Sequence, residues 1–453
     1  MKLGLGVQMF LARIALRNVR SMEKLELDFS SGEQDVRRWT LLLGENGCGK
    51  SSVLRAIALL LAGSDALADL FDSADDWVRN GARFCRIEGT LMTAGGQPRE
   101  ISLEIHRGDT LRDLYSRNEA SLGALDAAIA HTDRNYFVLG YGVSRRPNAT
   151  SRSKKPAFFP EEYARSPRAQ GLGTMFTPDF PLVSVEQWAM DLEYREGSKS
   201  LVAVRSALNH LLPGMTFHGI DKKTRQMMFR TEDGLVPLRQ LSDGYQIMAA
   251  WCGDLLYRIT QTFPDRKNPL ATRGVLLIDE LDLHLHPVWR RKLVEFLSTT
   301  LPNFQFIATT HSALTAQQSG EGELFVIKRE GPKETPILQP FVGEPRRMML
   351  HQLLMSPMFG LETLDSVEVE EARSKVRRLS EKKTPLSSSE RLELRSSKAV
   401  LTEAPSWDAV PNYAKEQTSL LKSIRSSIGA GGKRPKVSVA KLKASVKALE
   451  SSK

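Results

Sequence analysis

A glycine-rich loop of residues 44–51, GENGCGKS, follows the pattern G-x-x-x-x-G-K-[ST] without departure. An apolar stretch precedes it and a helix-forming stretch follows, as a phosphate-binding loop of this pattern requires. Its glycines let backbone N–H groups face an anion, and the helix start adds positive potential. We expect Lys50 to reach the β and γ phosphates and the Ser51 hydroxyl to bind Mg²⁺. The predicted triphosphate-binding residues are Gly44, Glu45, Asn46, Gly47, Cys48, Gly49, Lys50, Ser51 and Ser52.

Two acids and a histidine follow apolar stretches much later in the chain. Asp279 ends GVLLID, Glu280 comes next, and His311 ends FQFIATTH. We expect Asp279 to hold Mg²⁺ and Glu280 to orient or deprotonate the attacking water. His311 lies where ligands collect in α/β sheets and is suited to hydrogen-bond the γ-phosphate. The predicted catalytic residues are thus Lys50, Glu280 and His311, and the predicted metal ligands are Ser51 and Asp279.

The stretch LSDGYQ at 241–246 runs into an apolar helix-forming segment. Ser242 and Asp243 favour a helix start, because a short hydroxyl or carboxylate can cap free N–H groups. Gly244 lets the backbone approach a ligand. His284 and His286 form an H-x-H pair, but two imidazoles without a third ligand favour packing or a subunit contact over zinc.

The strands that must position these residues are apolar or alternating stretches at 9–30, 39–43, 136–142, 274–280, 304–311 and 323–330. Helical periodicity between several of them predicts an α/β sheet core. The segment 144–173 is rich in Pro, Ser and Arg and is expected to be a long, mobile loop. Helices are expected from about residue 343. Residues 429–453 hold seven Lys or Arg against one Glu, which favours a solvated, disordered end or transient contact with DNA or RNA.

Composition limits the classes of protein that remain. The 453 residues include 41% hydrophobic and 26% charged residues, which is ordinary for a soluble globular protein. We expect no membrane span and no signal peptide. Cys48, Cys85 and Cys252 have no paired spacing, so a reducing, cytoplasmic location is expected. The net charge of +10 would assist contact with a polyanion.

The order of these motifs resembles the ABC-type ATPase heads of the SMC, RecF and OLD class. In that class the LSDGYQ turn corresponds to the signature motif, and NVRSMEKLELDF, DELDLHLHP and TTHS have counterparts. The resemblance covers roughly residues 9–330. It implies an α/β fold: a P-loop ABC-type ATPase head with a mixed sheet, a largely helical insertion lobe and a helical C-terminal region.

The expected domains follow from this resemblance. They are an N-terminal ATPase lobe (1–63), an insertion lobe (64–235) with a coupling loop near 137–146, a C-terminal ATPase lobe (236–342), a helical region (343–428) and a basic flexible tail (429–453). By similarity, the coupling segment includes Tyr141 to Arg145, and no glutamine stands clearly at its coupling position.

A narrower resemblance is to the compact PtuA-like ATPases of bacterial Septu anti-phage systems, which also occur beside retrons. It is carried by FVLGYGVSRR at 137–146 and LLMSPMFGLETLDSVEVEEAR at 353–373. The resemblance implies ATP and Mg²⁺ as cofactors and a homodimer or higher oligomer closed around ATP. In such a dimer Ser242 and Gly244 would contact the other chain's nucleotide. It also implies a separate HNH nuclease as partner. The alternative is a DNA repair or recombination ATPase of the SMC/RecF class that acts directly on DNA.

Overall fold

The computed structural model describes residues 2–3, 10–31, 36–92, 98–131, 137–145, 166–196, 201–212, 214–221, 223–232, 234–264, 268–283, 285–330, 335–361, 363–382 and 384–403. The chain divides into two compact units, Met1–Glu362 and Thr363–Lys453, and each is described by itself. Across the described ranges, none of the helices combines the length and apolarity needed to cross a membrane.

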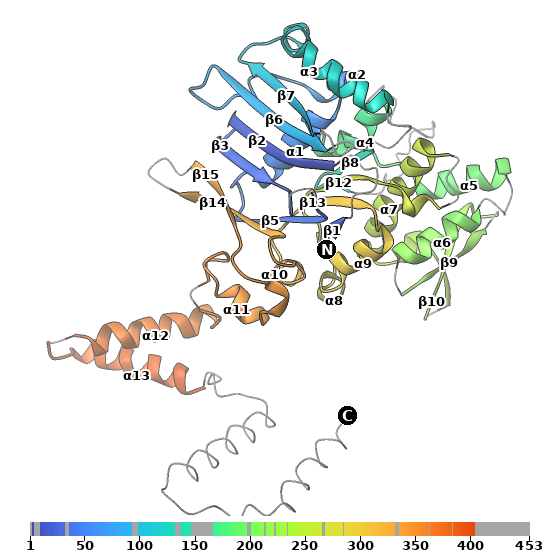
Figure 1. The fold of residues 1–453 in the computed structure, drawn as a ribbon. Coiled ribbons are helices and arrows are strands. Elements are labelled where there is room, and N and C mark those ends of the chain that lie inside the picture. The colour runs from blue at the N-terminus through green and yellow to red at the C-terminus, as the bar shows by residue number, and fades with distance from the viewer. Residues whose placement is uncertain are drawn as a thin grey trace, which may run out of the picture. The chain divides into compact units, whose positions relative to one another are not determined.

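A six-stranded sheet forms the centre of the first unit (Figure 1). Its order is β15 (Thr335–Pro340), β14 (Leu324–Glu330), β5 (Trp39–Leu43), β13 (Phe304–Thr310), β12 (Gly274–Ile278) and β8 (Val138–Tyr141). All neighbours are parallel except β15, which is antiparallel to β14. The registers pair Leu43 with Thr310 and Ile278 with Tyr141, so the carboxyl ends of four strands share one edge. The loops that leave this edge carry the candidate site residues.

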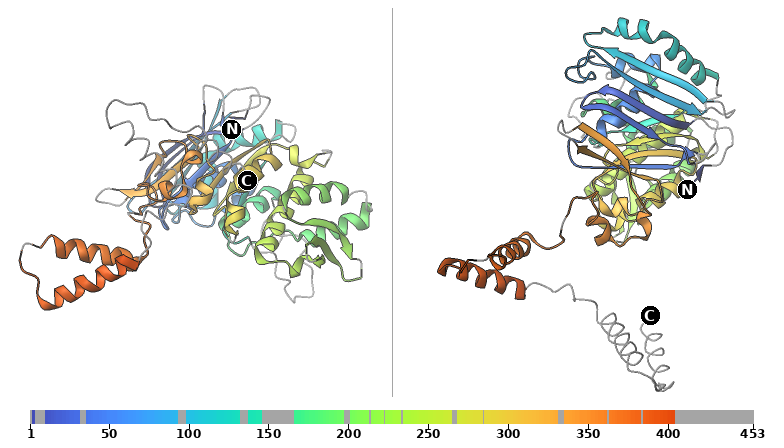
Figure 2. Two further views of the ribbon diagram at one scale, coloured as in Figure 1. Left: turned by 90° about the horizontal axis from the view of Figure 1, so that it is seen from below. Right: turned by 60° about the vertical axis from the view of Figure 1, so that its left-hand side comes forward.

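A second, antiparallel sheet lies over one face of the central sheet, with helix α1 (Lys50–Leu61) between them (Figures 1 and 2). Its strands are β3 (Met22–Asp28), β2 (Phe10–Val19), β6 (Phe84–Met92) and β7 (Pro98–His106), in that order. Nine of the twelve α1 residues are buried, because the helix packs against both sheets. The short strands β1 (Lys2–Leu3) and β4 (Val36–Arg37) pair with each other.

Both faces of the central sheet are covered, as its continuous apolar strands require. Along β12, Val275 and Leu277 join the core around α1, whereas Leu276 and Ile278 join a second core on the opposite face. The α1 side also holds α2 (Ser64–Leu70), α3 (Leu111–His131) and α4 (Pro167–Phe176). The opposite face holds α5 (Val185–Glu196), α6 (Leu201–Leu211), α7 (Asp243–Thr262) and α9 (Leu293–Thr300).

Smaller elements complete the first unit. A three-stranded sheet consists of β9 (Thr216–Asp221), β10 (Gln226–Thr231) and β11 (Gly234–Pro237). Short helices are α8 (Pro287–Arg290), α10 (Ala313–Ala316) and α11 (Leu350–Leu354), with 3₁₀ turns at Leu238–Gln240, Pro269–Ala271 and Pro345–Arg347.

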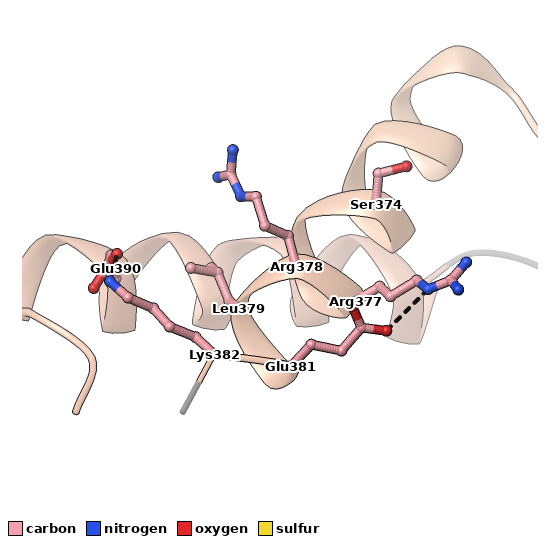
Figure 3. A pocket seen from close by; sticks show the side chains of 7 residues that line it. All are labelled: Ser374, Arg377, Arg378, Leu379, Glu381, Lys382 and Glu390. Carbon is pink, nitrogen blue, oxygen red and sulfur yellow. Dashed lines mark hydrogen bonds and ion pairs between the residues drawn. The ribbon is translucent and has the colours of Figure 1, made fainter. Parts of the chain in front are cut away.

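The second unit is a hairpin of α12 (Val367–Ser380) and α13 (Ser388–Glu403). Apolar residues with low exposure recur every three or four positions along α12. Ala372 and Leu379 are buried, and Val369 and Val376 are half-buried. A shallow hollow on the hairpin is lined mainly by charged side chains, among which Arg377 pairs with Glu381 (Figure 3). Lys382 also pairs with Glu390 at 2.5 Å.

The predicted α/β class is confirmed, and the predicted core strands lie within a residue or two of their expected bounds. The prediction of a loop over 144–173 is wrong in its last part, because residues from Pro167 onward form α4. Proline at the first position of a helix is favoured, since its missing N–H has no helical partner there. Within the range 64–235, β6 and β7 belong to the second sheet and β8 belongs to the central sheet. Residues 146–165 and the tail 429–453 lie outside the described residues.

Candidate nucleotide-binding site

The loop between β5 and α1 has the backbone that its glycines allow. Gly47 and Gly49 have φ of 77° and 104°, values that side-chain-bearing residues rarely adopt. Gly44 is required for a different reason, because a Cβ there would lie 2.2 Å from the carbonyl oxygen of Ile327. The loop leads directly into the start of α1, whose first turn contains no acidic residue. Free N–H groups and positive potential therefore meet at one point, as an anion site needs.

Lys50 folds back over this loop. Its Nζ donates to the carbonyl oxygens of Gly44 and Glu45, each at 2.9 Å, and the residue is buried. Burial lowers the pKa of Lys50, although the nearby charges of Glu280 and Asp279 oppose that shift. The amine thus lies within the electrostatic field of both acids, and a phosphate would be a stronger acceptor than two carbonyls. Ser51 and Ser52 follow in the first turn of α1, both half-buried.

Arg329 on β14 also holds the loop, by donating from NH2 to the carbonyl oxygen of Gly47 at 2.7 Å. Sequence reasoning missed this residue. In the sequence, Arg329 is marked only by its position near the end of an apolar strand, a position that many arginines occupy.

Asp279 lies at the end of β12, almost fully buried. Its Oδ1 accepts a hydrogen bond from Thr309 Oγ1 at 2.6 Å, and its backbone N–H donates to Tyr141 at 2.8 Å. One carboxylate oxygen is thus fixed by β13, and among the described residues no hydrogen bond engages the other. Such an oriented, buried carboxylate suits a hard divalent cation.

Glu280 has an unusual backbone, with φ of 51°. A glutamate in the left-handed region costs on the order of 1 kcal/mol or more. Its N–H donates to Thr309 Oγ1 at 2.7 Å, and its Oε1 lies 3.0 Å from His311 Nε2. Burial raises the pKa of the Glu280 carboxyl and lowers the pKa of the His311 imidazole. A neutral imidazole can then donate its proton to the glutamate and fix the direction of that carboxylate.

Asp282 and Arg145 complete the surroundings of the acid pair. Asp282 accepts from Thr310 Oγ1 at 2.6 Å and lies 3.6 Å from Arg290 Nε. Arg145 is buried and donates from NH2 to the backbone carbonyl of Glu280. Arg145 had been expected only as the end of the coupling segment. Its buried contact with the acid pair could not be inferred from a Ser- and Arg-rich stretch.

The predicted turn at 241–246 forms the start of α7. Ser242 occupies the N-cap position without a side-chain capping bond, and both Ser242 and Asp243 are exposed. The side chain of Gln246 instead donates to the carbonyl of Leu241 at 2.7 Å. Within the described residues, no hydrogen bond joins this turn to the 44–51 loop. The structure therefore brings together Lys50, Asp279, Glu280 and His311, but not Ser242 and Gly244.

Asp243, one of the two residues expected to favour a helix start, lies in the first turn of α7. A negative charge there is favoured by the helix dipole by about 0.3–1 kcal/mol. Tyr245 turns away from the helix start and packs edge-on against Trp289, with ring centroids 5.1 Å apart. The turn is thus anchored to the segment that follows Glu280.

A buried polar cluster anchors α7 more deeply. Asp254 accepts from Tyr141 Oη at 2.9 Å, from Arg258 Nε at 2.8 Å and from the Val183 N–H at 3.0 Å. Burial and the neighbouring Asp254 raise the pKa of Tyr141 well above its ordinary value, so the phenol keeps its proton. The cluster ties α7 to β8, the strand that leads into Arg145.

The other sequence candidates have structural roles. His286 is the N-cap of α8, where its Nδ1 accepts from the Val288 N–H at 3.4 Å, and His284 lies outside the described residues. Over the described part of the chain, no group of three or more His, Cys, Asp or Glu side chains is arranged to hold a metal ion. The three cysteines are free and buried.

Two protein-family models match the chain. One, described as "AAA domain, putative AbiEii toxin, Type IV TA system", matches residues 127–316, and another AAA domain matches 13–129. Among solved structures, the chain is similar to the recombination mediator RecF bound to a nucleotide, with TM-score 0.41 and 13% identity, covering 75% of this chain and 100% of that one.

Three relatives have related names. Septu protein PtuA of Bacillus thuringiensis is 33% identical over 69% of this chain and 74% of its own length. Septu protein PtuA of Bacillus mycoides is 27% identical over 79% of this chain, which spans only 45% of that relative. The Retron Vc95 probable ATPase of Vibrio cholerae is 23% identical over 67% of this chain and 71% of its own length.

The fold, the phosphate loop and the two family models define a P-loop, AAA-type protein with an α/β core. Within that class, the match to the Bacillus thuringiensis protein extends over most of both chains. The chain belongs to the family of Septu PtuA proteins. The resemblance to Septu and retron ATPases that was predicted from the sequence is confirmed.

Proposed function

We propose that this chain hydrolyses ATP at the 44–51 loop with Glu280 as general base, in a site that a second copy completes. The hydrolysis cycle would control a separate effector in anti-phage defence. The observation that carries this proposal is the Glu280 carboxylate, strained in its backbone, held 3.0 Å from His311 and electrostatically coupled to Lys50. A carboxylate so placed has little structural value, whereas a base for water attack needs this arrangement.

ATP and Mg²⁺ fit the residues present. The loop offers positive-φ glycines, a helix start free of acidic residues and a lysine bonded to two carbonyls of its own loop. Ser51 and Asp279 would hold Mg²⁺, which supplies positive charge for the phosphate oxygens when bound. The fixed Asp279–Thr309 hydrogen bond supports this assignment, since metal-binding carboxylates are commonly oriented by a neighbouring donor.

Each of the proposed catalytic residues then has a distinct role. Lys50 would leave its loop carbonyls and pair with the β and γ phosphates, a charge-assisted contact that favours the bound state. Glu280 would accept the proton of the attacking water. The single N–H of the neutral His311 would be donated either to Glu280, which it orients, or to the γ-phosphate, so that loss of this phosphate changes its contacts.

The second copy is needed for the exposed turn of α7. Ser242 bears an uncapped helix start, and no described hydrogen bond links this turn to the loop of its own chain. Free N–H groups at a helix start bind anions, so the turn is suited to the γ-phosphate held by another copy. ATP would therefore close a head-to-tail dimer, and hydrolysis would release it.

The partner proposal rests on family membership. We propose that the effector is an HNH nuclease encoded beside this ATPase. An affinity pull-down with tagged Glu280→Gln in the presence of ATP should retain that nuclease, because the closed dimer persists. Recovery of the nuclease without ATP, in the same amount, would contradict control by nucleotide state.

The catalytic assignment is tested by Glu280→Gln. This variant should bind a fluorescent ATP analogue normally while kcat falls by about 10²–10⁴-fold, the range for loss of a general base. Glu119→Gln, which removes an exposed carboxylate on α3, is the matched control and should keep wild-type turnover. Turnover by Glu280→Gln within tenfold of wild type would refute the assignment.

A further inference from the structure

Arg145 lies four residues after the paired end of β8, where the chain passes the acid cluster. The side chain is 3% exposed, and the charges of Asp279, Asp282 and Glu280 all act on it. Burial lowers the pKa of Arg145 to about 10, so the guanidinium stays charged at neutral pH. Its NH2 donates to the backbone carbonyl of Glu280. A buried cation therefore touches the peptide that carries the proposed base.

Two features beside this hydrogen bond lower the stability of the folded protein. Among the described residues, Arg145 Nε is buried without a hydrogen-bond partner, which costs about 1–3 kcal/mol. The peptide that Arg145 holds belongs to Glu280, whose left-handed backbone costs about 1–3 kcal/mol. Both costs arise in the two residues that this hydrogen bond joins, Arg145 and Glu280. Local costs of this kind concentrate at functional sites, where the surrounding structure maintains them.

Glu280 is held from three directions. Its N–H donates to Thr309 Oγ1 at 2.7 Å, its side chain meets His311 at 3.0 Å, and its carbonyl accepts from Arg145. Without Arg145, only the Leu283 N–H, at 3.1 Å, would hold the carbonyl end of this strained residue. The backbone could then relax toward an ordinary conformation and turn the carboxylate away from His311.

Arg145 is itself held by β8. The Tyr141 carbonyl accepts from the Asp279 N–H at 2.8 Å, and the Tyr141 hydroxyl binds Asp254 at 2.9 Å. Between Tyr141 and Arg145 the chain makes a tight turn, closed by the Arg145 N–H on the Val143 carbonyl at 3.0 Å. The guanidinium therefore reaches the acid cluster from a fixed backbone.

We propose that Arg145 is the positioning residue of the general base, holding the Glu280 peptide in the conformation that directs its carboxylate to the attacking water. This inference rests on the proposed function of Glu280. Arg145 acts through Glu280 and does not itself contact ATP. Its removal should therefore slow the chemical step and leave nucleotide binding unchanged.

The experiment compares Arg145→Met and Arg145→Lys in steady-state ATP hydrolysis and in binding of a fluorescent ATP analogue. Arg145→Met should lower kcat about 10- to 100-fold, the value of one charge-assisted hydrogen bond, with KM and Kd within about twofold of wild type. Arg145→Lys can still donate to the Glu280 carbonyl. The kcat of Arg145→Lys should be at least about fivefold higher than that of Arg145→Met, a rescue that a packing defect would not give.

Arg38→Met is the matched control. Arg38 is also buried and donates to backbone carbonyls, of Leu301 and Ser298, but it lies outside the proposed site. Its loss should lower the melting temperature and leave kcat within about twofold. If Arg145→Met does not fold, Arg145→Gln, which is neutral and shorter than arginine, takes its place. A kcat below wild type at unchanged KM supports the proposal, and wild-type kcat overturns it.

Three results would overturn the inference. They are an Arg145→Met kcat within twofold of wild type, a rise in KM or Kd with unchanged kcat, and the absence of any rescue by lysine. Failure of the proposed function is recognised separately, because Glu280→Gln would then retain turnover. If Glu280→Gln is inactive and Arg145→Met is fully active, only the positioning role is refuted.

Discussion

Replacing Asp254 by alanine should destabilise the first unit by about 3–5 kcal/mol, the usual cost of breaking a buried ion pair from one side. Asp254 is 1% exposed and accepts hydrogen bonds from Tyr141 Oη, Arg258 Nε and the Val183 N–H. Alanine would leave a buried guanidinium, a hydroxyl and an amide without their shared acceptor. Tyr141→Phe removes only one neutral donor and should cost about 1 kcal/mol.

Urea unfolding followed by tryptophan fluorescence measures this difference. Trp251 and Trp188 are buried in the same core as Asp254's partners, so they report on the region that is perturbed. With a slope of about 3 kcal/mol per M, the midpoint should fall by about 1–2 M urea. Asp191→Ala, which removes the half-buried partner of the exposed Arg195, should shift the midpoint by less than about 0.3 M.

The double variant Asp254→Ala with Arg258→Met checks the physical reason. If the main cost is an unpaired buried cation, removing that cation should restore part of the stability lost in Asp254→Ala. A midpoint for Asp254→Ala within 0.3 M of Tyr141→Phe would refute the reasoning. So would a double variant less stable than Asp254→Ala.

Two further predictions concern activity and assembly. Because burial raises the pKa of Glu280 above 4.5 and the base acts when deprotonated, kcat should fall as pH decreases through a value above 4.5. A kcat–pH profile whose acidic limb lies at or below 4.5 contradicts that account. Ser242→Arg, measured by light scattering in a Glu280→Gln background, should abolish ATP-driven dimers while the Kd for ATP changes less than about threefold. Ser116→Arg on α3, also exposed, should dimerise normally, and an unaffected Ser242→Arg would refute the role of the turn.

The core strands could be predicted because their apolar runs and the loops after them agree. The phosphate loop follows β5, and the acid pair follows β12, so pattern and chemistry support one sheet edge. The strands β6 and β7 were missed although apolar and polar residues alternate along both of them. β6 pairs with the distant β2, and β7 pairs with β6. The α4 helix was missed because the Ser- and Arg-rich residues before it dominate the local composition.

The residues of the proposed site could be named from the sequence where residue type and motif position alone suggest chemistry. Lys50, Asp279, Glu280 and His311 all follow motif positions, whereas Arg329 and Arg145 act through backbone carbonyls. Such contacts depend on where distant strands place an arginine, and no spacing in the sequence records that placement. The left-handed backbone of Glu280 was equally invisible, because glutamate gives no local signal for positive φ.

The position of β5 in the central sheet has a consequence for synthesis of the protein. Residues 39–43 leave the ribosome early, but their neighbours in the sheet are residues 304–310 and 324–330. Gly44 packs against the carbonyl of Ile327, so even the loop depends on that late strand. Such long-range pairing forms slowly and only after both partners exist. A nascent chain that ends before the strand at 324–330 would thus lack a finished phosphate loop, and ATP could bind only after that strand has been made.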